Sequence, residues 1–484
     1  MALSWVDFLV VVAYLIAITI FGAHFRKRQQ TLHDYFLGGR RLPWWAIALS
    51  VVSAETSILT IISTPGIAYR SNLAFLQLVL GYLVARVVVS LVFIPRYFAG
   101  ELFTAYQLIE QRFGRGLRIF TAALFLVTRA LAEGVRVFAI SIVIEVIFKT
   151  GVLVSVLIIT ALTLFYTFEG GFTAVIWTDV IQLLVYLSGT GLALGLALGA
   201  IPGGWTEVSQ LAHLAGNKFA VFNFHFNWHE PYLFWSGVLG GTFLTTASHG
   251  TDQLIVQRLL AARNQGQSQL ALLSSGLVIL FQFSLFLLVG VVLYGFYQHF
   301  PPATPFGRPD QIFPTFVVTH LPRGLAGLVT AAILAAAMAN LSAAFNSLAS
   351  SSVVDFYKPF VRPGADEKHY LRVSRGMTLV WGGVLILIAL VAQQCHRSVL
   401  ELALTIASVP YGSMLGIFLL GVLTRRANSR GTLCGALLGL VALSLVMEFT
   451  SIAWTWYVAI GTVVTFVGGW LVSAAVGDVE LPPA

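Results

Sequence analysis

Charged side chains are scarce in this sequence: Asp, Glu, Lys and Arg together make up 10% of its 484 residues. Soluble domains contain about 25% charged residues, so an ordinary soluble protein is excluded. Hydrophobic residues account for 58% of the chain, and the mean hydropathy is +0.86. The composition therefore predicts an all-α protein that crosses a membrane many times.

Other features are also missing. Cys395 and Cys434 are the only cysteines, too few for a disulfide framework or a metal cluster. The sequence has no Gly-x-x-x-x-Gly-Lys-Ser/Thr loop, and no loop between its apolar windows exceeds about 30 residues. An ATP-driven pump is therefore not expected, and neither is an enzyme. Repeated carbonyl-lining glycines of a pore are absent too, which argues against a channel.

Apolar windows of membrane-spanning length run through the whole chain. A helix needs roughly 20 residues to cross a ~30 Å hydrocarbon core. The first window begins with Asp7 and follows no basic region, so it predicts a retained span rather than a cleaved signal. About thirteen windows meet the length, at 5–25, 43–66, 74–98, 117–148, 152–169, 172–200, 231–256, 267–298, 323–354, 372–394, 399–424, 431–449 and 452–476.

Lys and Arg outnumber Asp and Glu by 28 to 20, and their placement indicates membrane topology rather than a nucleic-acid partner. One face of the predicted bundle collects basic residues at 26–42, 96–118, 258–263, 358–375 and 425–430. The other face holds only Arg70, Lys149, Lys218, Arg308, Arg323 and Arg397. The positive-inside rule then places the N-terminus outside and the C-terminus in the cytoplasm, in a multi-pass protein of the cell membrane.

The segment 44–69 is long and apolar enough to span, yet its middle holds Ser53, Glu55 and Thr56. A carboxylate at the bilayer centre costs roughly 2.5–3.5 kcal/mol on insertion scales, so Glu55 is expected to face a cavity or a partner. A span that breaks at such a point frees backbone groups that hold an ion or a solute. The alternative is a buried helix that uses Ser and Thr for close packing.

A second interrupted span is expected at 231–256, where Thr245, Ser248, His249 and Asp252 lie within or just below the apolar run. A lone histidine such as His249 is more often a hydrogen-bonded interior residue than a ligand or a proton carrier. Each interrupted segment opens a set of five apolar windows, the pattern of a transporter built from inverted repeats. We predict a leading helix with a cytoplasmic loop at 1–42, repeats at 43–200 and 231–424, an extracellular loop at 201–230 and trailing helices at 425–484.

Further polar side chains lie inside predicted spans. Asn340 and Ser342 supply oxygens that suit a hard cation such as Na⁺, although a helix rich in Ala and Ser also favours close packing. Asp179 is either a buried ion-binding carboxylate or an interfacial residue.

The fourth window places Glu133 four residues after Arg129 and three before Arg136, so an ion-pair ladder within one helix is expected. One positive charge is left over. If it faces a cavity, it would bind a substrate carboxylate with two parallel hydrogen bonds.

Five segments carry a resemblance to a known family: DYFLGGRRLPWW at 34–45, GELFTAYQLIEQRFG at 100–114, YTFEGGFTAVIWTDVIQ at 166–182, TDQLIVQRLLAARN at 251–264 and AAFNSLASSSVVDFYKP at 343–359. With these motifs the sequence resembles the sodium:solute symporter family, which includes the sodium–glucose, sodium–proline and sodium–multivitamin or monocarboxylate cotransporters. The resemblance implies a LeuT-type fold of two inverted five-helix repeats and alternating access driven by Na⁺.

The resemblance also implies where Na⁺ would bind. In the family the main site uses backbone carbonyls that correspond to those near Leu49 and Val52 and of Ala336 in this chain. It adds two adjacent hydroxyl residues, and here this sequence departs, because those positions hold Ala339 and Asn340.

A second Na⁺ site found in some members corresponds to Asp179 and Ser342, with Ala343 in place of a further serine. Fewer oxygens imply weaker Na⁺ binding, or a switch to protons carried by Asp179 or Glu55. If Asp179 is an ion ligand, Asp179→Ala is expected to weaken ion dependence and to spare the fold.

Sugar selectivity is not implied, because the lysine that characterises sugar-binding members is replaced by an apolar residue near Ile279, with Gln282 nearby. Such a pocket suits a small polar organic solute, whether sugar, monocarboxylate, amino acid or vitamin. The residues expected around it are Glu55, Thr56, Gln77, Thr245, Ser248, His249 and Arg136.

The sequence thus predicts a secondary active symporter that couples Na⁺ influx to the uptake of a small polar solute. Its expected partners are the solute, Na⁺ and membrane lipid, with no nucleic acid and no obligate protein partner. A proton-coupled or uncoupled carrier of the same fold remains an alternative, as does a sensor that binds a solute without transporting it.

Overall fold

The computed structural model describes residues 4–25, 31–100, 102–148, 151–302, 305–307, 309–393 and 399–476. Every regular element in these ranges is helical, apart from one isolated bridge between Leu42 and Ala262. In chain order the elements are α1 (Trp5–Ala23), α2 (Leu32–Leu37), η2 (Gly38–Arg40), α3 (Trp44–Glu55), α4 (Ile58–Arg70), α5 (Leu76–Val92), α6 (Ile94–Phe98), α7 (Ala105–Phe113), α8 (Arg115–Phe148), α9 (Val152–Ala200), α10 (Gly204–Leu214), α11 (Phe234–Gly250), α12 (Gln253–Leu260), α13 (Gln265–His299), η3 (Pro309–Gln311), α14 (Ile312–His320), α15 (Leu325–Ser351), the π-helix η4 (Ser352–Val361), α16 (Glu367–Ala392), α17 (Val399–Leu423), α18 (Ser429–Phe449), η5 (Trp454–Trp456) and α19 (Tyr457–Val476).

Each predicted apolar window contains a helix, and the all-α fold is confirmed. Within the described ranges eight helices are long and apolar enough to span a membrane, and the pair α3 and α4 forms a further, bent candidate. The count of about thirteen spans stays a prediction. The windows 152–169 and 172–200 are joined in α9 across Gly171, whose φ of 55° lies in the left-handed region that glycine adopts without strain.

The first predicted interruption is confirmed between α3 and α4. Thr56 and Ser57 are extended, and the two helical segments meet at 67°. The Ser57 hydroxyl accepts a hydrogen bond from the Thr60 backbone N–H at 3.3 Å, which caps the start of α4. This cap is a neutral hydroxyl, so the cap itself adds no negative charge to the positive end of the α4 dipole.

The second predicted interruption lies between α11 and α12, at Thr251 and Asp252. The Asp252 carboxylate accepts a hydrogen bond from the Leu254 backbone N–H at 2.9 Å and caps α12. Two helices therefore end and restart inside the bundle, and side-chain oxygens replace backbone hydrogen bonds at each break.

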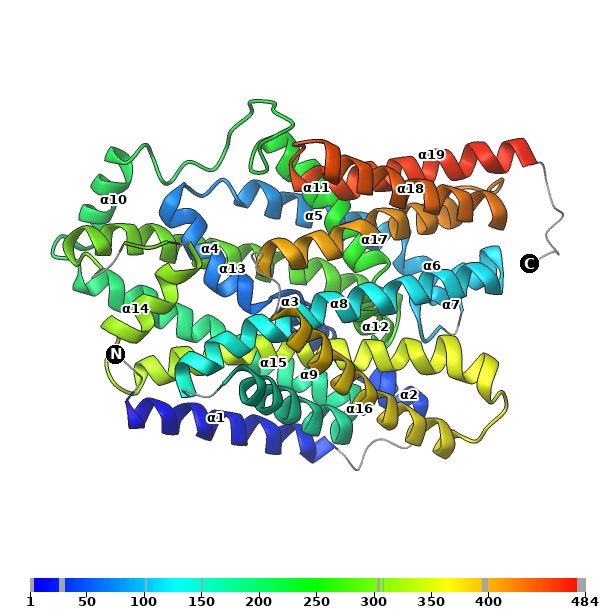
Figure 1. The fold of residues 1–484 in the computed structure, drawn as a ribbon, viewed down its shortest axis with the longest axis horizontal. Helices are drawn as coiled ribbons and strands as arrows, with labels where there is room; N and C mark the ends of the chain where they lie inside the picture. The colour runs from blue at the N-terminus through cyan, green and yellow to red at the C-terminus, as the bar shows by residue number, and fades with distance from the viewer. Residues whose placement is uncertain are drawn as a thin grey trace.

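The Ala- and Ser-rich helix α15 is the most deeply buried candidate span, with 94% of its most apolar window inside the protein. Its small side chains let neighbouring helices approach closely. The leading helix α1 packs along α15 and α9 (Figure 1). Asp7 fixes this contact, because its Oδ1 accepts backbone N–H bonds from Gly324 at 2.7 Å and from Gly327 at 2.8 Å.

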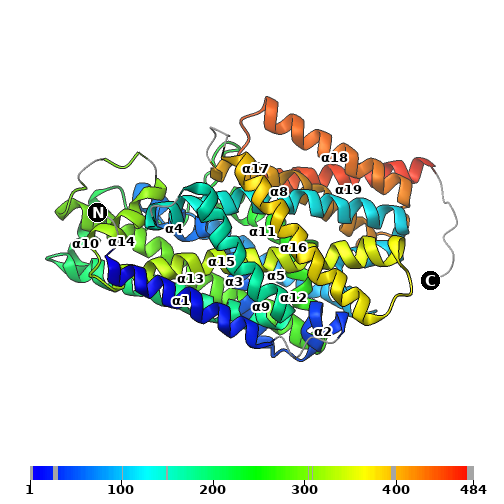
Figure 2. The same ribbon diagram turned by 60° about the horizontal axis from the view of Figure 1, so that its bottom comes forward.

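The helices that connect the spans gather at two opposite ends of the molecule. Figures 1 and 2 show α10 and α14 at one end and α2 and α7 at the other, while α18 and α19 pack on the side away from α1. α1 starts at the α10 end, and α19 finishes at the α7 end (Figure 1). Of the basic residues that predicted the topology, Arg26, Lys27, Arg28, Lys149, Arg308 and Arg397 lie outside the described residues.

Candidate functional site

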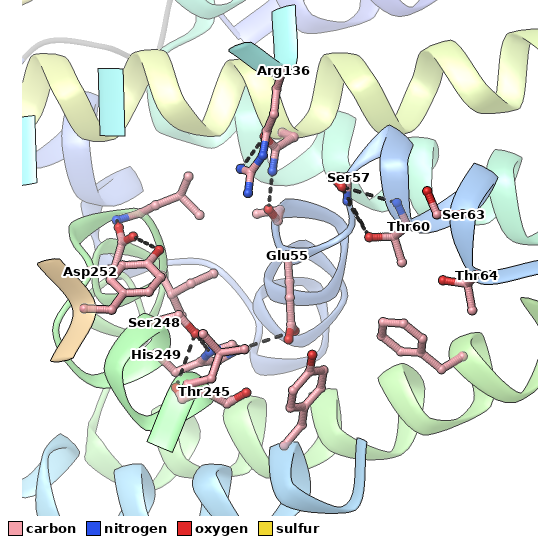
Figure 3. A pocket seen from close by; sticks show the side chains of 18 of the residues that line it. Glu55, Ser57, Thr60, Ser63, Thr64, Arg136, Thr245, Ser248, His249 and Asp252 are labelled. Atoms are coloured by element: carbon pink, nitrogen blue, oxygen red, sulfur yellow. Dashed lines mark hydrogen bonds and ion pairs between the residues drawn. The ribbon is translucent and has the colours of Figure 1, made fainter. Parts of the chain in front are cut away.

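A cavity of about 270 Å³ opens where the two breaks face each other (Figure 3). Its walls come from both sides of each break and from α5, α8, α13, α15 and α17. The volume lies near the lower end of the ~300–1,000 Å³ usual for small-molecule sites. The polar residues that line it are Glu55, Ser57, Thr60, Ser63, Thr64, Arg129, Arg136, Thr245, Ser248, His249, Asp252 and Asn340.

The predicted ion-pair ladder is present on α8. Glu133 Oε1 lies 3.1 Å from Arg129 Nη2 and 2.5 Å from Arg136 Nη1. Glu133 is 1% exposed and Arg136 is 24% exposed, so the arginine is the member that reaches the cavity. Its other contact is also made by Nη1, at 3.4 Å from Asn340 Oδ1. No described residue accepts a hydrogen bond from Arg136 Nε or Nη2, which leaves this two-donor edge available to a ligand.

The second arginine of the ladder is paired through both of its terminal nitrogens, while its Nε has no hydrogen-bond partner among the described residues. Arg129 Nη1 lies 3.4 Å from Asp252 Oδ2, and the Tyr411 hydroxyl donates to the same oxygen at 2.7 Å. Asp252, which also caps α12, is thereby neutralised. The pairing locks α8, α12 and α17 together on one side of the cavity.

Glu55 is placed at the end of α3 and faces the cavity with 18% of its side chain exposed. Its Oε2 lies 2.6 Å from Arg86 Nη2 on α5 and 3.4 Å from His249 Nε2 on α11. Arg86 is held in turn by Ser275, whose hydroxyl accepts from Nε at 3.0 Å. The described residues make no hydrogen bond to Glu55 Oε1, so one acceptor oxygen remains open.

The remaining residues that were predicted to line the solute-binding pocket divide into two groups. Thr245, Ser248 and His249 line the cavity, whereas Thr56 and Gln77 lie behind its wall. The Thr56 hydroxyl donates to the Val52 carbonyl at 2.7 Å and accepts from Gln282 Nε2 at 2.8 Å.

Gln77 joins the loop before α11 to α5. Its amide nitrogen donates to the Tyr232 carbonyl at 3.0 Å, and its amide oxygen accepts from the Asn223 N–H at 2.9 Å. Thr56 and Gln77 therefore brace elements around the cavity instead of facing it.

The residues predicted for the main Na⁺ site come from α3 and α15, which lie side by side. Asn340 connects them, because its amide nitrogen donates to the Ala54 carbonyl at 2.7 Å. Its amide oxygen faces Arg136. This orientation is the only one that satisfies both neighbours, since a carbonyl accepts and a guanidinium donates. Leu49 is half-buried, while Val52, Ala336 and Ala339 are buried at the same contact.

Asp179, predicted for the second Na⁺ site, is buried in an ion pair with Arg258 of α12. Asp179 Oδ2 lies 2.8 Å from Arg258 Nη2 and accepts from the Ser50 hydroxyl at 2.5 Å. Arg258 Nε also donates to Ser50 Oγ at 2.9 Å. Ser342 bonds instead to the Ala339 carbonyl at 3.0 Å. The Asp179 side chain is 0% exposed within the bundle, and its depth in the membrane stays a prediction.

Several cavity residues escaped sequence reasoning. Tyr411 is a lone tyrosine in an apolar window, and Ser63 is one of many serines, so neither carries a distinguishing signal. Arg86, which lies outside the cavity lining and pairs with Glu55, could have been found, because an arginine inside an apolar window requires a partner. Arg258 was counted among the loop cations, yet it is only 1% exposed.

Two broken helices whose breaks enclose one polar cavity define a secondary transporter. The sequence profile of the sodium:solute symporter family matches residues 35–439. The chain belongs to this family, and it is therefore a Na⁺-coupled solute symporter and not an enzyme.

Named relatives support the assignment over most of the chain. The human sodium/iodide cotransporter is 32% identical over 432 residues, which cover 87% of this chain and 65% of that protein. The sodium/sialic acid symporter NanT of Aliivibrio fischeri is 29% identical and covers 96% of this chain and 92% of its own. Human sodium-coupled monocarboxylate transporter 1 is 30% identical, with coverages of 87% and 69%.

Solved structures agree on the fold. The substrate-bound, outward-open state of a Na⁺-coupled sialic acid symporter superposes with a TM-score of 0.89, at 26% identity and 98% coverage of both chains. The nucleobase-cation symporter Mhp1 shares the fold with a TM-score of 0.61 at 13% identity, covering 94% of this chain and 97% of that one. The LeuT-type architecture is confirmed by these neighbours.

Proposed function

We propose that the solute is a small organic anion and that Arg136 binds its carboxylate. The observation that carries this proposal is the unused Nε–Nη2 edge of Arg136 at the cavity surface. A guanidinium edge matches a carboxylate with two parallel hydrogen bonds. The positive end of α4 begins at the same cavity and favours an anion there. The relatives are named for iodide, sialic acid and monocarboxylates, all of which are anions at neutral pH.

Charge balance supports the same reading and links the solute to Na⁺. An anion alone would leave a net negative charge in a low-dielectric site, and Na⁺ alone would leave a positive one, so each favours the binding of the other. In the described cavity and its immediate partners the guanidiniums of Arg86, Arg129 and Arg136 are matched by the carboxylates of Glu55, Glu133 and Asp252.

In the proposed ion site Na⁺ lies between the broken end of α3 and α15, near the carbonyls of Leu49, Val52 and Ala336. Asn340 lies between this site and Arg136. It donates to the Ala54 carbonyl of α3 and accepts from Arg136 of α8. The bound ion and the bound carboxylate would thus share one side chain. Asp179 and Ser342 remain the candidate residues for a second ion; Arg258 holds Asp179 Oδ2, while Oδ1 has no hydrogen-bond partner among the described residues.

Replacing Asn340 with Ala is expected to weaken solute affinity and Na⁺ affinity together. The change removes one amide that holds Ala54 and orients Arg136, each through a hydrogen bond worth about 1 kcal/mol, or roughly fivefold in affinity. Na⁺ titrations of solute uptake measure both constants. Asn340→Ser restores a hydroxyl ligand and should strengthen Na⁺ binding. Unchanged Na⁺ dependence in Asn340→Ala would remove this residue from the ion site.

The proposed cycle uses the two repeats, 43–200 and 231–424, with the leading helix at 1–42, the loop 201–230 and the trailing helices 425–484 around them. Na⁺ binding from outside stabilises the outward-open state, solute binding permits closure, and both are released into the cytoplasm. We propose that the end carrying α10 and α14 faces outward, so that the N-terminus is outside and the C-terminus is cytoplasmic. α2 and α7 lie at the opposite end, and the chain carries Arg40, Arg41, Arg112 and Arg115 in or next to these two helices. The positive-inside rule places such basic residues in the cytoplasm, which supports this orientation.

Reconstitution into liposomes tests the function directly. An inward Na⁺ gradient should drive accumulation of a radiolabelled carboxylate such as lactate. An inside-negative membrane potential should increase uptake only if more Na⁺ charges than solute charges cross the membrane in each cycle. Choline in place of Na⁺ should reduce uptake to the level of empty liposomes. Equal uptake in Na⁺ and choline, with a rate that follows the pH gradient, would favour the proton-coupled alternative.

A further inference from the structure

A loop on the surface of the molecule carries large aromatic side chains that the solute cavity does not explain. Between α10 and α11 the chain reads FNFHFNWH at 222–229, in which an aromatic residue alternates with Asn or His. The aromatic side chains are 47% to 62% exposed, and none of them lines the cavity. They are Phe222, Phe224, Phe226 and Trp228, and we call these four residues the aromatic face.

The four rings lie on one side of the loop. Phe222 and Phe224 stack nearly parallel, with 7° between their planes and 5.9 Å between their centroids. The ring centroids of Phe226 and Trp228 are 5.0 Å apart. Residues two apart meet in this way when the chain is extended, because successive side chains then point to opposite sides. The loop therefore has an aromatic side and, from the Asn and His residues in between, a polar side.

The loop is fixed beside the beginning of α19. The Trp228 carbonyl accepts the Ala453 backbone N–H at 2.8 Å, and the rings of Trp228 and Trp456 pack with centroids 4.7 Å apart. Figure 1 shows the loop standing out from the bundle and returning to α11 close to the start of α19. η5 and α19 form a candidate membrane span that begins at Trp454. The first residues of a span lie where hydrocarbon gives way to water, so the aromatic face is held at the depth of that boundary.

The aromatic face continues onto the exposed surface of α11. The Phe224 ring lies 4.8 Å from that of Phe234, and the Phe224 carbonyl accepts from the Trp235 indole N–H at 3.2 Å. Trp235 and Leu239, one helical turn apart, are 45% and 43% exposed. Exposed apolar side chains at this spacing are typical of a lipid-facing helix surface in a membrane protein. The loop and the start of α11 thus present one apolar patch.

We propose that the aromatic face is a membrane anchor, which inserts into the headgroup region of the lipid bilayer while the Asn and His residues stay toward water. Aromatic rings concentrate at this interface. The segment 221–229 belongs to no helix or strand, so its backbone N–H and C=O groups need water and cannot enter the hydrocarbon core. The inference depends on the membrane location of the chain and on neither the solute nor the orientation of the termini.

The loop also connects this anchor to the helices that line the cavity. The Asn223 carbonyl accepts from the Phe234 backbone N–H at 2.8 Å, at the start of α11. Lys218, which is 4% exposed, donates its ammonium group to the Tyr69 carbonyl at 2.6 Å, near the end of α4. These are the ends of α4 and α11 that lie away from the breaks. The bilayer surface is therefore linked through one loop to both half-helices.

Depth measurements on spin labels test the anchor in a bilayer. The native cysteines are removed as Cys395→Ser and Cys434→Ser, and single cysteines are introduced in turn at positions 222–229. Each is labelled with a nitroxide, and the protein is reconstituted into vesicles of phosphatidylcholine and phosphatidylglycerol. We expect labels at the aromatic positions to be relaxed by oxygen, which dissolves in lipid, and to lose relaxation by a water-soluble nickel chelate. Labels at the Asn and His positions should show the reverse.

Two exposed positions calibrate the measurement. A label at Ala215→Cys, just past the end of α10, reports water, and a label at Val441→Cys, on the exposed surface of the candidate span α18, reports lipid. All substituted side chains in this experiment except Asn227, which is half-buried, are exposed where the structure describes them, and thermal unfolding before reconstitution checks that each variant is folded.

Paired variants then show whether the rings hold the loop in the interface. Phe222→Ser combined with Phe226→Ser should restore nickel access to a label at position 224, because the neighbouring rings no longer insert. Asn223→Ser combined with His225→Ser changes the polar side of the same loop and is the matched control. This second pair should leave the label at position 224 protected from nickel.

The outcomes are distinguishable. Nickel access at every position of the loop would overturn the anchor, because the whole segment would then lie in water. Protection of the aromatic positions from both oxygen and nickel would also overturn it and would indicate a protein contact, such as a second copy of this chain. Unchanged protection at position 224 in the Phe222→Ser and Phe226→Ser variant would reject the role of the rings.

Discussion

Arg136→Gln is expected to weaken the binding and concentrative uptake of the anionic solute strongly. The substitution removes the charge and the two-donor edge that we assign to the carboxylate. Charge-assisted hydrogen bonds contribute about 1.5–3 kcal/mol, so solute affinity should fall by roughly 10- to 100-fold. The fold should be spared, because Glu133 keeps its contact with Arg129 at 3.1 Å. Solute affinity is measured by isothermal titration calorimetry or by the solute concentration that gives half-maximal uptake.

Two further variants make this test specific. Arg136→Lys keeps the charge and loses the planar fork, so it should restore only part of the affinity. Arg263→Gln, which changes an exposed arginine that donates to the Arg41 carbonyl, is the matched control and should behave like the unmodified protein. Full uptake by Arg136→Gln would show that the carboxylate binds elsewhere.

Asp179→Ala is expected to destabilise the protein strongly, by about 3–5 kcal/mol, because it leaves the buried Arg258 without its partner. The sequence alone suggested that this change would weaken ion dependence and spare the fold. The ion pair changes that expectation: Arg258 is 1% exposed and has no route to water without disturbing α12. Thermal unfolding in detergent measures the loss.

A double variant separates the two roles of Asp179. Asp179→Ala combined with Arg258→Leu removes both charges and should recover much of the lost stability, since no unpaired charge then remains buried. If Asp179 also binds a second Na⁺, the double variant should be stable and yet show reduced Na⁺ cooperativity of uptake. A single Asp179→Ala variant as stable as the parent would contradict the importance of the ion pair.

Sequence reasoning located the breaks because their cause is local. A carboxylate and several hydroxyls in the middle of an apolar span conflict with lipid, and the chain resolves the conflict by ending α3 at Glu55 and α11 at Gly250. The ladder of Arg129, Glu133 and Arg136 was predictable for a similar reason, because residues three and four apart on a helix are always neighbours.

Partners that come from distant parts of the chain were not predictable. Nothing in the spacing of Asp179 and Arg258 indicates that they meet, and the roles of Thr56 and Gln77 as braces follow only from the positions of Gln282 and Tyr232. The sequence also gave no means of telling which cavity groups are already paired, and that distinction is what separates Arg136 from Arg129.

By itself, the sequence determined that this protein is a helical membrane transporter with two interrupted spans, because composition and helical periodicity act over short stretches of chain. Only the tertiary structure decided which polar groups face the solute. Charge pairing between helices far apart in the sequence engages Asp252 with Arg129 and Asp179 with Arg258, whereas the Nε–Nη2 edge of Arg136 and one oxygen of Glu55 make no hydrogen bond to a described residue and stay open to a ligand.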